Sequence, residues 1–400
     1  MNKKLALYLQ RLVVILGAAI AICGLTLFAL DLTRFPNFTY FQGQLVFPDF
    51  WLFWSAAQLA LKGQAVGVYD PAIFTAQLSQ LIQMNPAAQS APFYYPPTFL
   101  LFLMPFGLLP YFVAGLTFYL FSLAVFMLMV WTWSRRGWAV VAMLGFLGVW
   151  VNLSVGQNGL LTAGLLGLAL AWRDERPVLG ALALAMLLIK PHFGILLPLV
   201  LLVGGHWRCF LYTCLFALLF ILATVLAFGI DVWWAFPNGI MVALKVLWSA
   251  EPLLMRMSSL FAFLRLGGLE QPLPMQIQSY FAMFVALVTL VFYFRARTQP
   301  ALGAALVASA AMLVTPFMYD YDLALLAIPL VLLARVAWQR GLCWADWVLL
   351  PLAFAWPAVV NWLPYMTGLQ FGFVVPLALW ILTLCRLWRG AFLPVAPSLG

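Results

Sequence analysis

The sequence predicts an all-α, polytopic membrane protein. Two observations support this prediction: 66% of the 400 residues are hydrophobic and only 8% are charged, whereas soluble domains carry about 25% charged residues. The mean hydropathy of +1.05 agrees with both. So few polar groups cannot cover a soluble globule, which excludes soluble enzymes, nucleic-acid-binding proteins and disordered scaffolds.

Charges, prolines and glycines divide the chain into apolar segments, and a membrane helix needs about 20 residues. We expect about 12 transmembrane helices, at residues 12–30, 111–133, 138–151, 157–172, 177–190, 192–204, 208–229, 274–294, 300–316, 321–335, 346–362 and 369–388. Four prolines interrupt a further segment, 96–109, which we expect not to cross. No convincing cleavage site follows the first span, so we expect it to be retained rather than removed as a signal peptide.

The distribution of basic residues sets the predicted orientation, because cytoplasmic loops are rich in Lys and Arg. If 96–109 does not cross, fourteen of the twenty basic residues and both termini are cytoplasmic. Most acidic residues then lie outside, together with two sizeable outer loops at about 31–95 and 230–273. In the first loop, 49–62 and 71–84 are expected to be helices on the membrane surface. Residues 1–400 form a single integral membrane domain in this interpretation.

Asp49 is the most informative polar residue. It follows Phe47 and Pro48 and precedes the aromatic run 50–54, so desolvation should raise its pKa, as suits a general base or an ion site. The alternative is a helix N-cap, a position that Asp favours, and both roles can coexist. Asp70, directly before Pro71, is interpreted as an N-cap.

Lys190 lies between two short apolar runs, directly before Pro191. A lysine at this position is costly unless it meets an anion or an aqueous cavity, and the proline disfavours helix there. The alternative is a lysine that extends to the membrane interface. His192 is a candidate ligand or second donor, although a structural histidine is the simpler interpretation.

Polar side chains also lie in a short turn and beside a proline pair on the predicted outer side. The amides of Asn152, Gln157 and Asn158 are suited to sugar hydroxyls or to broken helix ends. Tyr95 belongs to a Tyr-Tyr-Pro-Pro run that is typical of an interfacial aromatic belt.

The segment 315–322 is the densest polar cluster between two apolar spans. Its Tyr319, Asp320 and Asp322 are candidates for a cation or substrate site, or for capping the next helix. Arg256 and Arg265, in the second outer loop, are candidates for a phosphate clamp or are solvated loop charges.

These candidates all fall at the predicted outer ends of spans, which predicts one outward-facing cavity with a carboxylate and a cation. Such a pair suits glycosyl transfer from a lipid-phosphate sugar. The carboxylate would take the proton of the acceptor hydroxyl, and the cation would stabilise the charge on the leaving phosphate.

The chain resembles glycosyltransferase family 87, a family of polyprenyl-phosphate-mannose-type transferases in the C-type superfamily. The resemblance rests on an ordered set of short motifs across about 50–330. They are Asp49-Phe50, Ala56-Ala57, Leu61-Lys62-Gly63, Val68-Tyr69-Asp70-Pro71, Tyr95-Pro96-Pro97, Gly156-Gln157-Asn158, Lys190-Pro191, Thr315-Pro316 and Tyr321-Asp322-Leu323. Many relatives carry a histidine just after the Ser/Thr-Pro pair, where this chain has Phe317 and Met318.

The resemblance implies the C-type glycosyltransferase fold and an inverting transferase that moves a mannose-like hexose from a polyprenyl-phosphate donor to a lipid or glycan acceptor. It implies Asp49 as the catalytic base, no metal and no cofactor, and a place in the inner or plasma membrane. Two other classes stay open: a transporter that uses Asp49, Lys190, Asp320 and Asp322 for substrate or coupling ions, and a non-catalytic assembly partner.

Overall fold

The computed structural model describes residues 3–34, 39–40, 44–82, 93–249 and 251–390. This part of the chain is helical apart from one antiparallel pair of two-residue strands, β1 (Thr39–Tyr40) and β2 (Gln44–Leu45). The predicted all-α class is therefore confirmed. All five cysteines are free.

Five helical segments of the described chain are long and apolar enough to cross a membrane. They are α1 (Lys3–Arg34), α5 (Tyr111–Ser134), α11 (Trp207–Phe228), α15 (Leu273–Arg295), and α17 (Ala327–Arg340) together with the 3₁₀ turn η7 (Asp320–Leu326). Each coincides with a span that the sequence predicts. The protein is therefore a membrane protein.

A sixth candidate span is bent by 49° between α6 (Gly137–Leu144) and α7 (Leu147–Val155). Gly145 stands at the bend, where an added Cβ would lie 2.4 Å from the carbonyl oxygen of Gly17 in α1. The glycines thus allow α1 to cross α6 at close range, as small residues do in membrane helix pairs. The indole of Trp150 donates to the carbonyl of Leu144, which satisfies a backbone group that the bend exposes.

The other predicted spans appear as shorter apolar helices of 10–17 residues, so the count of twelve crossings stays a prediction. They are α8 (Gly159–Trp172), α9 (Pro177–Met186) with η4 (Leu187–Ile189), η5 (Pro191–Phe193) with α10 (Leu197–Gly204), α16 (Pro300–Leu313), α18 (Trp344–Val359) and α20 (Val374–Gly390).

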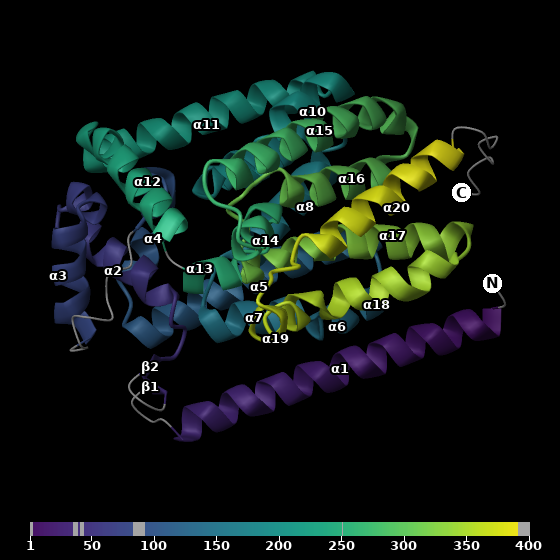
Figure 1. Ribbon diagram of the computed structural model, residues 1–400, viewed down its shortest axis with the longest axis horizontal. Helices are drawn as coiled ribbons and strands as arrows, with labels where there is room; N and C mark the ends of the chain where they lie inside the picture. The colour runs from purple at the N-terminus through teal and green to yellow at the C-terminus, as the bar shows by residue number, and fades with distance from the viewer. Residues whose placement is uncertain (1–2, 35–38, 41–43, 83–92, 250, 391–400) are drawn as a thin grey trace.

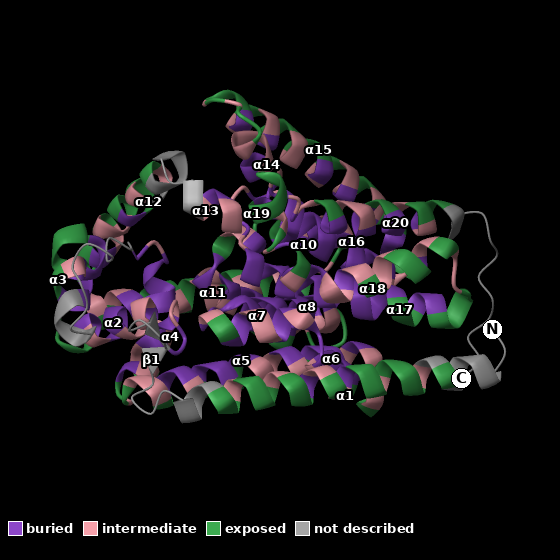
Figure 2. Ribbon diagram, turned by 60° about the horizontal axis from the view of Figure 1, so that its bottom comes forward, coloured by how far each residue is buried: buried purple, intermediate pink, exposed green. Residues whose placement is uncertain are grey.

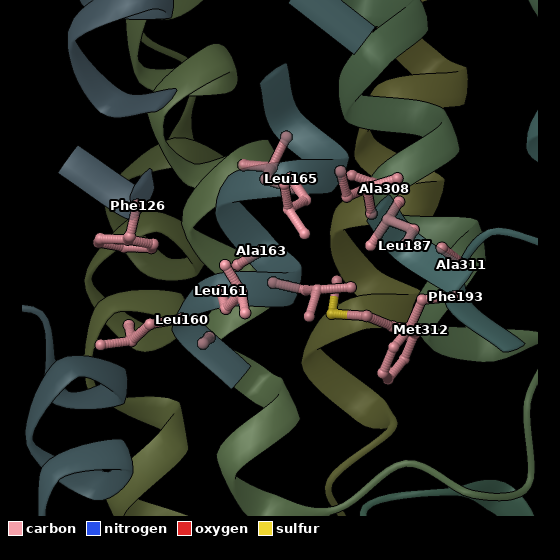
Figure 3. Packing of buried hydrophobic residues seen from close by; sticks show 14 of the residues in the cluster. Phe126, Leu160, Leu161, Ala163, Leu165, Leu187, Phe193, Ala308, Ala311 and Met312 are labelled. Atoms are coloured by element: carbon pink, nitrogen blue, oxygen red, sulfur yellow. The ribbon is translucent and has the colours of Figure 1, made fainter. Parts of the chain in front are cut away.

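The core of the bundle is built on two of these short helices, α8 and α16, which are buried along almost their whole length. Both are rich in Ala, Gly and Leu, so neighbouring backbones approach closely: an added Cβ on Gly164 would lie 2.8 Å from the backbone of Val125 in α5. Side chains from α8, α16 and the segment around Phe193 interdigitate in this core (Figure 3). The long helices α1 and α11 instead expose apolar side chains, as lipid-facing helices do.

The two predicted outer loops are themselves helical. The first holds α2 (Phe50–Leu61), η2 (Ala65–Tyr69) and α3 (Pro71–Ile82); the second holds α12 (Asp231–Ser249), α13 (Glu251–Arg256) and α14 (Leu260–Leu266). The segment 96–109 forms the short apolar helix α4 (Pro97–Gly107), and its expected failure to cross stays a prediction. The helices predicted at 49–62 and 71–84 are present as α2 and α3, with residues 83 and 84 outside the described residues, whereas α12 was not predicted. The place of α2 and α3 on the membrane surface stays a prediction. α2, α3 and α12 gather at one end of the molecule, opposite the start of α1 and the end of α20 (Figures 1 and 2).

Several polar contacts join residues that are predicted to lie on the same side of the membrane. On the predicted cytoplasmic side, Arg335 donates to the carbonyl of Trp133 and Arg340 to the side chain of Gln299. Arg386 pairs with Asp346 at 2.5 Å on the same predicted side. The remaining short structural elements are η6 (Ala296–Thr298), in the same region, and α19 (Leu363–Thr367), at the other end.

Candidate active site

Asp49 lies just before α2, in a segment whose backbone is fixed by several hydrogen bonds. Phe47 adopts a left-handed backbone with φ 61°, and the hydroxyl of Tyr111 donates to the carbonyls of Val46 and Phe47, both at 2.8 Å. The backbone N–H of Asp49 donates to the carbonyl of Val155 at 2.7 Å. The Asp49 carboxylate occupies the N-cap position but makes no capping hydrogen bond, so the cap-only interpretation is wrong.

The Asp49 side chain instead meets two residues from distant parts of the chain. Its Oδ2 accepts a hydrogen bond from Gln157 Nε2 at 3.3 Å and one from Arg256 at 3.3 Å. The side chain is 22% exposed. Burial raises the pKa of Asp49 above its ordinary value, and the nearby Arg256 and Gln157 offset part of that shift. The predicted direction of the pKa shift is confirmed.

Arg256 is the cation closest to this carboxylate. It donates to both oxygens of Asp320, at 3.1 and 3.3 Å, as well as to Asp49. Burial disfavours its charged form, but the carboxylates of Asp320 and Asp49 outweigh that effect and raise the pKa of Arg256. Its side chain is 33% exposed, so it is neither a solvated loop charge nor a fully buried one.

Local backbone contacts bring Arg256 to this place. Directly after α13, Met257 forms an isolated antiparallel bridge with Tyr319, and the N–H of Ser258 donates to the carbonyl of Met318 at 2.6 Å. The second outer loop is thereby joined to the segment that carries Asp320.

Lys190 stands at a break between two helical segments, as the sequence predicted, with φ −148° and ψ 71°. Its ammonium pairs with Asp322 at 2.5 Å and donates to Asn158 Oδ1 at 3.3 Å. Lys190 is 3% exposed, so the interpretation as a lysine reaching the interface is wrong. Asp322 also accepts from the N–H of Tyr319 at 3.2 Å, so it caps η7 and holds the lysine at once.

Tyr321 links the two cations, although in the sequence it stood out only as part of a family motif. Lys190 Nζ lies 4.7 Å and the Arg256 guanidinium carbon 5.7 Å from the centre of its ring. Such contacts are attractive because the ring face is negative. Tyr319 stacks on Tyr321 at 5.5 Å with an interplanar angle of 7°. The Tyr-Asp-Tyr-Asp alternation was the available signal, since it places two aromatic rings among two carboxylates.

The amides of the α7–α8 turn were predicted to bind sugar hydroxyls or to satisfy broken helix ends, and the structure shows that they differ in this respect. Asn152 donates to the carbonyls of Gly148 and Tyr321 and accepts from the N–H of Leu160, so it satisfies helix ends. Gln157 and Asn158 instead contact Asp49 and Lys190. Tyr95 donates to Gln157 Oε1 at 3.3 Å and is 6% exposed, so it is not part of an exposed aromatic belt.

Other candidates have different surroundings. Arg265 donates to the carbonyl of Leu269, in its own loop. The ring of His192 packs on Phe193 at 4.4 Å, and its Nε2 is buried without a hydrogen-bond partner among the described residues. Asp70 caps α3 as predicted, accepting from the N–H groups of Ala72 and Ile73 at 2.8 and 3.2 Å.

The structure therefore gathers carboxylates, cations, amides and tyrosines from six chain segments into one network. Its members are Asp49, Tyr95, Gln157, Asn158, Lys190, Arg256, Tyr319, Asp320, Tyr321 and Asp322. Within the described residues, no group of three or more His, Cys, Asp or Glu is placed to hold a metal ion. Such a network can accept a proton at Asp49 and offer positive charge at Arg256 to an anion.

Comparison with known proteins gives one match. A model of glycosyltransferase family 87 matches residues 93–316, more than half of the chain. No curated protein and no solved structure matches. The matched region includes Tyr95, Gln157, Lys190 and Arg256, and Asp49 precedes it. This membrane protein therefore belongs to glycosyltransferase family 87.

Proposed function

We propose that this membrane glycosyltransferase transfers a mannose-like hexose from a polyprenyl-phosphate sugar to a lipid or glycan acceptor, with Asp49 as the general base. The observation that carries the proposal is the state of Asp49. Its carboxylate is partly exposed, its pKa is raised, and a neighbouring cation lies at 3.3 Å. A base whose pKa is raised toward the working pH is more effective in taking a proton.

The proposed step is a single displacement. The acceptor hydroxyl oxygen attacks the anomeric carbon and forms the new glycosidic bond, while its proton passes to the Asp49 carboxylate. The bond between the anomeric carbon and the phosphate oxygen breaks, and its electron pair stays on the departing polyprenyl phosphate. General-base assistance of this kind contributes about 10²- to 10⁴-fold in rate.

Arg256 is the proposed partner of the donor phosphate. Its side chain is 33% exposed and adjoins Asp49, so an anion bound there would lie next to the base. Arginine suits a phosphate because its planar fork donates two hydrogen bonds. Lys190 is only 3% exposed and is paired with Asp322 and Asn158, so its proposed part is to position Asp322 and the ring of Tyr321.

The remaining predicted contacts complete the proposal. Tyr319, Asp320 and Asn158 are members of the carboxylate and cation network, and we propose them as contacts for the transferred sugar. His192 and Arg265 stay predictions, since the contacts seen here join neither to Asp49.

The outer face of the inner or plasma membrane is the proposed side of the reaction, with both termini cytoplasmic. Two observations support this orientation. The Lys and Arg residues concentrate on the predicted cytoplasmic side. The contacts of Arg335 with Trp133, Arg340 with Gln299 and Arg386 with Asp346 each join two residues of that same side. The outer surfaces of α1 and α11 expose apolar side chains, and we propose that the polyprenyl chain packs against surfaces of this kind.

Transfer of radiolabelled mannose by the purified protein tests the donor class. Polyprenyl-phosphate mannose and a nucleotide-linked mannose would be offered separately, with extracted membrane lipids as acceptor. We expect labelled product from the lipid-linked donor alone. Transfer from the nucleotide sugar, or from neither donor, would contradict the proposal.

A further inference from the structure

The two hydrogen bonds to the Asp49 carboxylate end on the same oxygen. Gln157 Nε2 and Arg256 each donate to Oδ2 at 3.3 Å. Among the described residues no hydrogen bond ends on Oδ1. A carboxylate held through one oxygen keeps a fixed plane, so the other oxygen is presented in one direction, ready to accept a proton.

The amide of Gln157 is itself held in one orientation. Its Oε1 accepts from the hydroxyl of Tyr95 at 3.3 Å and from the backbone N–H of Asn158 at 3.3 Å. Since an amide has an acceptor at one end and a donor at the other, two donors on Oε1 leave the NH₂ group facing Asp49. That group stabilises the charged, proton-accepting form of the carboxylate.

The backbone next to Gln157 contacts the segment 47–49, which carries Asp49. Gly156 has φ 74°, and an added Cβ there would lie 2.6 Å from Cβ of Phe47. The carbonyl of Val155 accepts the N–H of Asp49 at 2.7 Å. Three successive residues of the α7–α8 turn therefore contact the 47–49 segment.

Burial separates this arrangement from a substrate contact. Gln157 is 5% exposed, and both ends of its amide are bonded to protein groups. This burial and these bonds favour a role within the protein over contact with a sugar hydroxyl.

We infer that Gln157 is a positioning residue that orients the Asp49 carboxylate through Oδ2, and that Tyr95 acts through Gln157 by fixing the direction of its amide. The inference rests on the proposed role of Asp49 as the base. It assigns to Gln157 and Tyr95 a role other than contact with the sugar.

The first test reads the protonation of Asp49 directly and needs no substrate. A hydrophobic carbodiimide modifies carboxyl groups in their protonated form, and mass spectrometry of the Asp49 peptide gives the labelled fraction against pH. Replacing Gln157→Met removes the donor at nearly equal length. Since that donor lowers the pKa of Asp49, the labelling midpoint should move to higher pH. The variant leaves the other groups that face Asp49 unsubstituted: Arg256, Asp320, Tyr94 and Tyr95.

Gln58→Met is the matched control. Gln58 lies in α2, the helix that Asp49 precedes, and its amide donates to the carbonyl of Gly107 at 2.6 Å. This variant removes a side-chain amide of the same kind from the helix next to Asp49 without touching Asp49, so its labelling midpoint should equal that of the wild type.

The second test is kinetic, with polyprenyl-phosphate mannose as the donor. Gln157→Met should lower kcat by about 10- to 100-fold, because a misplaced reacting group costs that much, and should leave KM for the donor unchanged. Tyr95→Phe should have a smaller effect of the same kind. The double variant should be no slower than Gln157→Met alone, because Tyr95 acts through Gln157.

The outcomes separate this inference from the proposed function. A raised KM with an unmoved labelling midpoint in Gln157→Met would make Gln157 a substrate contact and overturn the inference, while Asp49→Asn would still be inactive. An active Asp49→Asn variant would overturn the proposed function. Equal midpoint shifts in Gln58→Met and Gln157→Met would also overturn the inference, because the effect would then be a general loosening of α2.

Discussion

At the scale of single residues, the site is a balance of charges around Asp49. Burial raises the pKa of its carboxyl group, Arg256 lowers it and Asp320 raises it. The base must be unprotonated to act, so the acid limb of the pH profile should lie above the ordinary aspartate value of about 3.9.

The two neighbours should move that limb in opposite directions. Arg256→Gln removes a positive charge that favours the carboxylate, so the limb of kcat/KM should move to higher pH. Asp320→Asn removes a negative charge, so the limb should move to lower pH. The pH dependence of kcat/KM for the two variants gives both shifts. Shifts of the same sign would contradict the assignment of this limb to Asp49.

The pair of Lys190 and Asp322 should be important for stability. Both side chains are almost wholly buried, at 4% and 0% exposed, and removing one partner of a buried pair costs about 3–5 kcal/mol. Lys190→Met should therefore lower the free energy of unfolding in detergent by about this amount. The double variant with Asp322→Asn should recover part of the loss, because no unpaired charge is left. Wild-type stability of Lys190→Met would show that the pair does not hold the fold.

The residues of the site were predictable singly but not in their pairing. Asp49 and Lys190 stood out because a charge in an apolar sequence needs a reason. Their partners lie far away in sequence: Asp322 is 132 positions from Lys190, and Asp320 is 64 from Arg256. No local pattern encodes such distances, so Tyr321, whose ring contacts both cations, was missed.

At the scale of elements, the α7–α8 turn determines where Asp49 lies. Gly156→Ala places a methyl group 2.6 Å from Cβ of Phe47 at a backbone φ of 74°. We expect it to displace the 47–49 segment and to lower kcat by about 10²-fold. Initial transfer rates at saturating polyprenyl-phosphate mannose measure the effect.

Gly63→Ala is the matched control for that variant. Gly63 has nearly the same backbone, φ 75°, but an added Cβ there meets nothing within 4 Å. Both variants place an alanine in a left-handed backbone, and only Gly156→Ala adds the collision with Phe47. Equal kcat for the two variants would mean that the turn does not position the base.

The helices themselves were predicted to different degrees. Capping signals located α3, since Asp70 and Pro71 form an N-cap and a first helical residue. α12 was missed because Pro237 and Gly239 within it are typical of loops. Tertiary contact compensates for both: Gly239 allows the backbone of Phe93 and the ring of Tyr69 to approach closely, and Phe236 packs on Tyr69 at 5.7 Å.

At the scale of the whole molecule, the sequence predicted an all-α membrane protein with its polar candidates at one end. The number of membrane crossings does not follow as directly from the lengths of the apolar segments. Helices such as α8 and α16 are shorter than a bilayer requires, because they pack inside the bundle and need not meet lipid along their length.

The predicted orientation has a direct test in a variant without its five cysteines. Lys62→Cys and Arg136→Cys each place a thiol at an exposed position, on opposite predicted faces. A membrane-impermeant maleimide applied to intact cells with an accessible outer face should label Lys62→Cys. It should label Arg136→Cys only after the membrane is opened. The reverse pattern would invert the topology, and labelling of both in intact cells would contradict it.

In the proposed function, Asp49 takes the proton in an outer-face transfer from a lipid-linked sugar. The most direct measurement compares turnover of purified wild type, Asp49→Asn and Asp70→Asn with radiolabelled polyprenyl-phosphate mannose. Asp70 is an exposed aspartate whose side chain caps α3, and Asn retains that capping role. We predict that Asp49→Asn lowers turnover by about 10²-fold or more and that Asp70→Asn matches the wild type. Turnover by Asp49→Asn at the wild-type rate would contradict the account.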